Sequence, residues 1–341
     1  MRLLIFTQKV DAKDPVLGFF CGWISALARE AEAVHVICLE EGEYDLPENV
    51  TVYSLGKEQG ANKLEYIIHF YHHLYVVNGL YDKVFVHMNQ EYLLLGGIYW
   101  KLRGISVYFW RNHLIGNIFT RLAVFLSTKV FCTSKGSFTA RFKKTTIMPA
   151  GIDTEMFKII PHISRKNNSI CMVGRISPIK KIDLSLRVVK KLIDSGTQVS
   201  LSIVGPVAQK DVLYFNSLKE YVSKNKLSSY VQFQDAVSQD KLPEIYNSYE
   251  ICLNLTESGS FDKTIVESAA CGAVPIVWNK SLKGIMPDQC ITDIEPDSIA
   301  DSIKNVLNPS VRVEVVRELE KFAESQSLRQ LTDLLVEFMS K

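Results

Sequence analysis

Short apolar runs rich in β-branched residues alternate along the chain with longer amphipathic segments. In the first half, the short runs cover residues 3–7, 34–39, 50–55, 83–87, 105–110, 129–133 and 146–148. Their apolarity is continuous rather than alternating, which is typical of strands buried on both faces of a parallel sheet. The segments between them, at residues 20–30, 63–77, 91–102 and 114–126, have helical periodicity. This alternation predicts an α/β fold in which helices cover a doubly wound parallel sheet.

The same pattern restarts after an irregular stretch at residues 151–168. Strands are predicted at residues 169–173, 198–204, 230–233, 251–255 and 274–278, and helices at residues 182–195, 211–225, 242–248 and 264–270. We therefore expect two doubly wound domains, over residues 1–160 and 161–326. A last helix within residues 327–341 follows, and periodicity does not decide whether it returns to the first domain. Ligands of such sheets bind at the carboxyl ends of the strands, so the cleft between the two domains is the expected site.

Composition limits the class of protein. The chain has 341 residues, of which 47% are hydrophobic and 22% are charged, and this excludes an intrinsically disordered chain. Its seven cysteines form no Cys-x-x-Cys pair, which indicates buried free thiols in a reducing compartment and disfavours zinc. No run reaches the about 18 apolar residues of a membrane-spanning helix. We expect a cytoplasmic protein, with peripheral contact to a membrane left open.

The charges are nearly balanced overall but not locally. Lys and Arg number 39 against 37 Asp and Glu, which argues against a nucleic-acid-binding protein. Residues 92–151, however, contain no acid and nine cations: Lys101, Arg103, Arg111, Arg121, Lys129, Lys135, Arg141, Lys143 and Lys144. Two interpretations stay open, namely chance placement of surface cations or a face that meets phosphates or a membrane.

The first chemical motif follows the strand at residues 169–173. Gly174 and Arg175 come directly after the strand, and Lys180 lies five residues further on, before a helix begins. Arginine offers a planar fork to phosphate oxygens and lysine a compact charge, so these residues are a candidate anion site. The alternative is a pair of solvated cations in a polar loop.

The second motif lies at residues 261–277, after the strand at residues 251–255 and a polar loop. A loop that leads into a helix N-terminus exposes backbone N–H groups and the positive end of the helix dipole, which favours anions. Glu267 is the one acid in an otherwise small and apolar helix. It is either an exposed helical carboxylate or a carboxylate that faces the cleft and accepts hydrogen bonds from ligand hydroxyls.

Together these motifs resemble the retaining nucleotide-sugar glycosyltransferases of family 4, also called group 1 glycosyltransferases. Residues 267–275, Glu-Ser-Ala-Ala-Cys-Gly-Ala-Val-Pro, are similar to that family's Glu-Ala-Met-Ala-Cys-Gly-x-Pro segment. Residues 149–153, Pro-Ala-Gly-Ile-Asp, are similar to its Pro-Asn-Gly-Val-Asp connector. The resemblance covers nearly the whole chain and implies the GT-B architecture, in which two Rossmann-like domains face each other across a cleft.

The resemblance also implies roles for individual residues. Arg175 and Lys180 would bind the donor diphosphate beside Gly174, and Glu267 would hold the ribose hydroxyls. The donor sugar would be lined by Gly259, Ser260, Phe261 and Asp262, the phosphates would meet the backbone of Lys263 and Thr264, and residues 232–237 would lie near the base.

Two positions depart from the family pattern. The family has a glutamate eight positions before Glu267, where this chain has Gly259, and Glu257 lies two residues further upstream. Three explanations stay open: Glu257 reaches the site, Asp262 substitutes for it, or the sugar is read without that carboxylate. Lys181 also stands where the family has glycine.

The first half offers fewer candidates. Gly18 follows the first strand, and the resemblance implies that its loop approaches the diphosphate; the alternative is a simple turn glycine. His113 matches a cleft histidine that the family places beside the donor sugar, whereas His87 has weaker support.

The implied reaction is glycosyl transfer with retention, in which Arg175, Lys180 and the helix N-terminus at Thr264 stabilise the leaving diphosphate. No Asp-x-Asp motif is present, so we expect neither a metal nor a cofactor. The partners expected are a UDP-, GDP- or ADP-sugar and a glycan or lipid-diphosphate-linked acceptor, as in bacterial surface-polysaccharide assembly. An epimerase or phosphorylase of the same fold, or a degenerate nucleotide-sugar-binding module, stays open.

Overall fold

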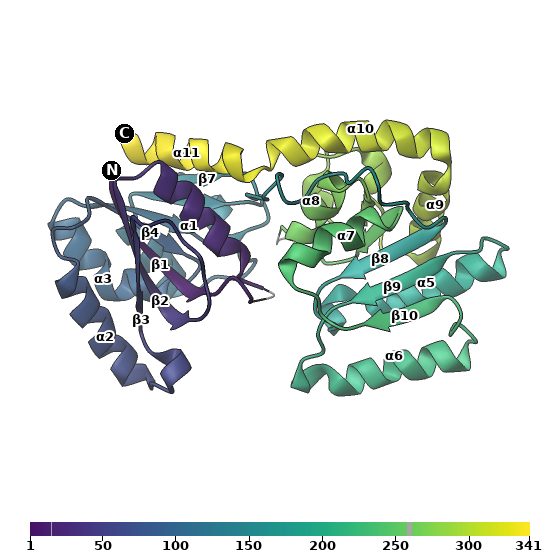
Figure 1. Cartoon of the computed structure of the whole chain (residues 1–341), viewed down its shortest axis with the longest axis horizontal. Coiled ribbons are helices and arrows are strands. Elements are labelled where there is room, and N and C mark those ends of the chain that lie inside the picture. The colour runs from purple at the N-terminus through teal and green to yellow at the C-terminus, as the bar shows by residue number, and fades with distance from the viewer. Residues whose placement is uncertain (15, 258–260) are drawn as a thin grey trace. The chain divides into compact units, whose positions relative to one another are not determined.

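The computed structural model describes residues 1–14, 16–257 and 261–341, and these form two compact units. Among the described residues, the first unit contains Met1–Gly151, Phe261 and Leu328–Lys341, and the second contains residues 152–257 and Asp262–Ser327. Each unit has one parallel sheet with helices on both sides (Figure 1). This confirms the predicted α/β class of two doubly wound domains.

The sheet of the first unit has seven strands in the order β3-β2-β1-β4-β5-β6-β7, and every pairing is parallel. The strands are β1 (Arg2–Val10), β2 (Ala33–Glu41), β3 (Val50–Ser54), β4 (Lys83–His87), β5 (Ser106–Trp110), β6 (Lys129–Cys132) and β7 (Thr145–Ile147). Each coincides with an apolar run of the sequence, because strands buried on both faces tolerate few polar residues.

Helices α2 (Lys63–Val76), α3 (Glu91–Leu102) and α4 (Ile118–Leu126) bury their inner residues in one hydrophobic core. Helices α1 (Phe19–Arg29) and α11 (Leu328–Ser340) share the other core of this unit. The chain's last helix is thus part of the first unit, where the Trp23 indole donates to the Gly151 carbonyl at 2.9 Å and the Tyr108 hydroxyl donates to the Phe338 carbonyl at 3.0 Å.

The helix predicted at residues 114–126 is shorter than expected, because α4 begins only at Ile118. Asn117 caps it: its side chain accepts from the Thr120 N–H, and the Thr120 hydroxyl accepts from the Asn117 N–H. This reciprocal cap fixes the start of the helix, and the residues before it stay in a loop.

The sheet of the second unit has the order β10-β9-β8-β11-β12, again parallel throughout. Its strands are β8 (Ser169–Val173), β9 (Ser200–Val204), β10 (Val231–Gln234), β11 (Ile251–Asn254) and β12 (Val274–Val277). Its helices are α5 (Ile182–Asp194), α6 (Val212–Lys224), α7 (Leu242–Asn247), α8 (Lys263–Ala270), α9 (Pro296–Leu307) and α10 (Pro309–Ser325). Helices α9 and α10 are not among the predicted elements, although each begins with a proline, which favours a helix start.

Short 3₁₀ turns join several elements, at Lys57–Gln59, Phe138–Arg141, Pro178–Lys180, Gln209–Asp211, Gln239–Lys241, Lys280–Leu282 and Asp288–Cys290. None of the helices in the described parts of the chain is both long and apolar enough to cross a bilayer.

Candidate functional site

The candidate site lies in the second unit, at the carboxyl ends of β8 and β11. These strands are neighbours at the point where the strand order reverses direction, and such a point opens a crevice at the sheet's carboxyl edge. Gly174 and Arg175 follow β8, while Leu255 and Thr256 follow β11. The first predicted motif and the segment that leads into the second are thus adjacent at the edge of the sheet.

Two glycines bring the backbone of this edge close together. Gly174 has φ +133° and Gly205, after β9, has φ +153°, conformations that side-chain-bearing residues rarely adopt. A Cβ on Gly205 would overlap the Gly174 carbonyl oxygen, so no side chain fits there. A Cβ on Gly174 would lie 3.3 Å from Lys180 Nζ, which places that ammonium directly over the loop backbone.

Lys180 forms an ion pair with Asp262, and both side chains are largely buried. Asp262 is also the cap of α8, because its Oδ1 accepts from the Thr264 N–H at 3.3 Å and from the Thr264 hydroxyl at 3.0 Å. The Asn254 side-chain amide donates to the Thr264 hydroxyl at 2.9 Å. A buried cation, a carboxylate and a helix N-terminus therefore meet at one point.

The ionised form of Asp262 is strongly favoured. Burial alone would raise the pKa of this carboxyl, but Lys180 and the hydrogen bonds from Asn254 and Thr264 outweigh it and lower the pKa to about 2. The carboxylate lies where the sequence predicted a phosphate, at the N-terminus of α8. Asp262 is thus the internal anion of the site, a role that the sequence motifs did not predict.

Arg175 is exposed and has no hydrogen-bond or ion-pair partner among the described residues. It differs in this from Lys180, whose charge is balanced by Asp262. The positive charge of Arg175 is therefore uncompensated and free to meet an anionic ligand.

Glu267 is buried, so the interpretation of an exposed helical carboxylate is wrong. The Tyr246 hydroxyl, which is also buried, donates to its Oε2 at 3.1 Å. Burial raises the pKa of Glu267, although Lys263 one turn earlier on α8 partly opposes this. Burial likewise lowers the pKa of Lys263. A buried carboxyl with a raised pKa is a common feature of ligand-binding sites.

The remaining predicted donor residues are placed only in part. Glu257 is exposed and Phe261 is half-buried, whereas Gly259 and Ser260 lie outside the described residues. Asp262 is the one acid of this loop that the structure brings to Lys180. The suggestion that Asp262 substitutes for the family's missing glutamate stays a prediction.

The candidates of the first half all belong to the first unit. Gly18 is the N-cap of α1, and a Cβ there would lie 2.6 Å from the Asp14 carbonyl oxygen, so the loop needs glycine. His113 is exposed, and its Nδ1 lies 2.9 Å from the Ile115 carbonyl oxygen of its own loop. His87 is buried, and its ring stacks on that of Phe20 with the ring centroids 3.9 Å apart, which indicates a structural role.

Sequence reasoning missed Lys9, which organises the loop before Gly18. Its ammonium lies 2.9 Å from Glu40, 3.1 Å from Asp14 and 3.2 Å from Asp11. Asp14 in turn accepts from the backbone of the loop and has a lowered pKa, despite its burial, because of those N–H groups and Lys9. Sequence reasoning also missed Asn254, Tyr246 and Gly205 of the second unit. Of these residues, only Asn254 had a signal in the sequence, because it is a polar residue at the end of the apolar β11.

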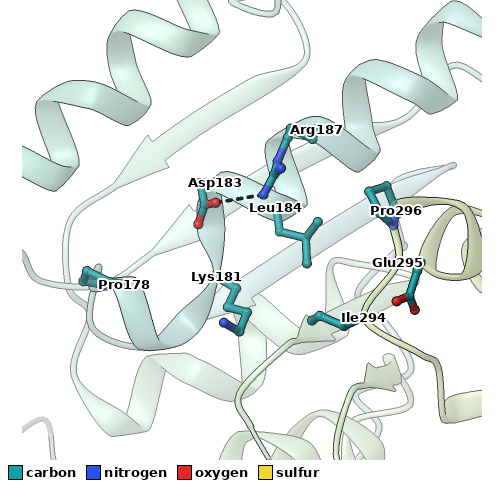
Figure 2. Close-up of a pocket in the computed structure, with 8 residues that line it drawn as sticks. All are labelled: Pro178, Lys181, Asp183, Leu184, Arg187, Ile294, Glu295 and Pro296. Carbon is teal, nitrogen blue, oxygen red and sulfur yellow. Dashed lines mark hydrogen bonds and ion pairs between the residues drawn. The ribbon is translucent and has the colours of Figure 1, made fainter.

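A hollow of about 320 Å³ lies beside the first motif, lined by residues of the Pro178–Lys180 turn, α5 and the segment before α9 (Figure 2). Lys181, Asp183 and Arg187 line one side, and Glu295 lines the other. Lys181 has φ +51°, a left-handed conformation that favours glycine, which explains why the family has glycine at this position.

Comparisons with known proteins identify similar sequences. Residues 167–309 match the family described as "Glycosyl transferases group 1". The chain is 21% identical over 171 residues to the phosphatidylinositol N-acetylglucosaminyltransferase GPI3 subunit of Saccharomyces cerevisiae, a match that covers 50% of this chain and 36% of that protein. It is 27% identical over 118 residues to D-inositol 3-phosphate glycosyltransferase of Rhodococcus opacus, covering 34% of this chain and 26% of the relative. The chain thus spans about a third or less of these curated relatives.

The whole chain also resembles solved structures. HepE of Anabaena, in complex with UDP and glucose, has a TM-score of 0.78 at 18% identity, covering 100% of this chain and 99% of that one. WaaG, a glycosyltransferase involved in lipopolysaccharide biosynthesis, has a TM-score of 0.72 at 16% identity, covering 99% of both chains. The predicted resemblance to the group 1 glycosyltransferases is therefore confirmed over residues 167–309, and the GT-B type of two-domain α/β fold is confirmed for the chain as a whole.

Proposed function

We propose that this chain is a retaining glycosyltransferase. It transfers a sugar from a nucleoside-diphosphate sugar to a glycan or lipid-linked acceptor, in surface-polysaccharide or glycoconjugate synthesis, and does so without a metal. The match of residues 167–309 to the group 1 glycosyltransferases and the likeness to a fold that binds UDP and glucose in HepE support the reaction class.

The observation that carries the proposal is the meeting of Lys180, Gly174 and the N-terminus of α8 at the carboxyl edge of the second sheet. Departure of a nucleoside diphosphate builds up negative charge on the leaving oxygen. Hydrogen-bond donors and cations that are already fixed at that point usually contribute more to catalysis than any other single effect. A lysine, an arginine and a helix N-terminus supply such donors from the protein itself, which is why the proposal includes no metal.

Binding of the diphosphate requires an exchange of anions. In this structure Asp262 neutralises Lys180 and accepts from the Thr264 N–H. A phosphate oxygen that takes the place of this carboxylate would meet the same ammonium and the same backbone donor. Arg175 is close in sequence, exposed and unpaired among the described residues, so it is suited to hold the second phosphate.

The test measures release of nucleoside diphosphate from UDP-, GDP- and ADP-sugars in the presence of EDTA, together with thermal shifts on the same ligands. The Arg175→Ala variant is compared with Arg317→Ala, an exposed arginine on α10 of the same unit. We expect one donor to be bound and slowly hydrolysed, with Arg175→Ala impaired and Arg317→Ala unchanged. No thermal shift with any donor would overturn the site, and release that EDTA abolishes would overturn metal independence.

A further inference from the structure

The outer surface of α4 is apolar, although the helix lies on the outside of its unit. Thr120, Ala123, Val124 and Leu126 are buried against the sheet. The opposite side carries Ile118, Phe119, Leu122 and Phe125, of which the exposed fractions are 69%, 54%, 46% and 63%. A helix that is hydrophobic all round is normally covered on all sides. Something outside this unit is therefore expected to cover α4.

The neighbouring helix extends this surface. α3 packs beside α4 and adds two exposed residues, Ile98 at 63% and Leu102 at 83%. We call these six residues the α3–α4 face: Ile98, Leu102, Ile118, Phe119, Leu122 and Phe125. Exposed apolar residues gathered on two packed helices mark an interaction site more often than scattered single residues do.

Cations border the α3–α4 face. Lys101 lies over the Phe125 ring at 3.9 Å, and Arg121 and Arg141 both lie over the Phe138 ring, at 5.6 and 4.7 Å. Lys101, Arg121 and Arg141 are exposed, as are Arg103, Lys135 and Lys143 of the same acid-free segment. The nearest acid of α3 is Glu91, at the opposite end of that helix from Leu102.

A hollow of about 370 Å³ opens at the edge of the face, between the last turns of α3 and α4. Lys101, Lys144, Ser127 and Thr128 line it together with Phe125. Lys144 donates to the Ser127 carbonyl at 2.7 Å and to the Val124 carbonyl at 3.0 Å, so its ammonium is held at the end of α4. Burial lowers the pKa of Lys144, and repulsion from the positive charge of Lys101 adds to this lowering. An anion in this hollow would relieve that repulsion.

We propose that the α3–α4 face docks on an anionic phospholipid bilayer, with Leu102, Leu122 and Phe125 inserted among the acyl chains and a headgroup phosphate seated between Lys101 and Lys144. Apolar residues ringed by Lys and Arg are the pattern of interfacial membrane binding. A symmetric contact with a second copy would place this cationic border against itself, and like charges disfavour that arrangement. The surface therefore fits a partner that has an apolar interior and negatively charged groups around it. A bilayer of anionic lipids has both.

The test is co-sedimentation of the full chain with vesicles of phosphatidylcholine alone and of phosphatidylcholine mixed with phosphatidylglycerol. Binding to the mixed vesicles only is expected. The Leu102→Ser/Leu122→Ser variant should bind about tenfold more weakly. Transfer of two leucine side chains from water into the acyl region stabilises the bound state, and the serines do not contribute this free energy. Leu213→Ser is the matched control, since Leu213 on α6 of the other unit is 84% exposed and Leu102 is 83% exposed.

The contribution of charge is tested with Lys101→Gln. This variant should bind the mixed vesicles more weakly than wild type, and added salt should weaken its binding by a smaller factor. Equal binding to both vesicle types, or an equal effect of Leu213→Ser, would overturn the proposal. So would a concentration-dependent dimer that the Leu102→Ser/Leu122→Ser variant abolishes, because a second copy would then cover the face. Sedimentation uses no sugar nucleotide, so its outcome is independent of the proposed reaction.

Discussion

The carboxylate of Asp262, which pairs with Lys180 and accepts hydrogen bonds from Asn254 and Thr264, is expected to stabilise the second unit by an amount that follows from its pKa. The pKa of Asp262 is lowered from 3.8 to about 2, and this difference corresponds to about 2 kcal/mol of preference for the ionised carboxylate in the folded state. Both side chains are less than one fifth exposed, so solvent screens the pair only weakly. Asp262→Asn keeps an oxygen that can cap α8 and removes the charge.

A double-mutant cycle separates the pair from its surroundings. Wild type, Lys180→Gln, Asp262→Asn and the double variant are unfolded in urea, and the coupling free energy is expected to lie in the range of about 0.5–3 kcal/mol that is usual for residues in contact. The two units can unfold separately, so the probe must report on the second one. Trp278 lies there, while Trp23, Trp100 and Trp110 lie in the first unit. The ¹⁹F signal of fluorinated Trp278 therefore follows the correct transition.

The pH dependence gives the cycle a second readout. Because the folded pKa of Asp262 lies below its ordinary value, the stability from this carboxylate is present in full above pH 3.8 and is lost as the pH falls through about 2. The difference between wild type and Asp262→Asn should narrow over that interval. A coupling free energy below about 0.5 kcal/mol, typical of an exposed pair, or a difference that does not change with pH, would refute the reasoning.

Three further predictions concern the scaffold and are tested by urea or thermal unfolding. Tyr246→Phe should cost about 1–2 kcal/mol, because Glu267 loses its buried donor, and should raise the pKa of Glu267 further; equal stability would show that water replaces the hydroxyl. Lys181→Gly should gain about 1 kcal/mol by relieving its left-handed conformation, reduced by the lost contact with the Trp278 ring; a loss would mean that this contact dominates. Leu335→Ala on α11 should destabilise the first unit by about 3 kcal/mol, because Leu335 is buried in its core, whereas an unchanged unit would place α11 outside that core.

Most of the fold could be predicted from the sequence because its strands are buried on both faces. Runs such as residues 34–39 and 251–255 are continuous in hydrophobicity, and the strands fall where the runs do. Helix starts were less predictable, since the cap at Asn117 depends on a reciprocal contact with Thr120 rather than on periodicity. A return of α11 to the first unit was open from the sequence but not decided by it, because the periodicity of an apolar helix face does not identify the unit on which it packs.

The sequence predicted the cations of the candidate site but not the residues with which they interact. Gly174 and Lys180 were identified by their position after a strand, and the structure brings them into contact. The pairing of Lys180 with Asp262 joins residues 82 positions apart and requires the geometry of two adjacent strand ends. The burial of Glu267 likewise depends on Tyr246, which comes from a different helix. The residues adjacent to each of these positions in the sequence do not indicate such contacts.

The difference between Lys180 and Arg175 leads to a last prediction, on affinity. A diphosphate that binds Lys180 must displace Asp262, so the new contact is offset by the loss of the buried ion pair between these two residues. Arg175 has no partner to lose among the described residues, and a charge-assisted hydrogen bond contributes about 1.5–3 kcal/mol.

Arg175→Ala should therefore weaken the binding of UDP about tenfold or more, and Lys180→Ala should weaken it less. Asp262→Asn should strengthen it, since the competing carboxylate is removed. Isothermal titration of the three variants with UDP measures this order directly. A larger loss for Lys180→Ala than for Arg175→Ala would show that Asp262 does not compete with the ligand, and that the two anions bind Lys180 together.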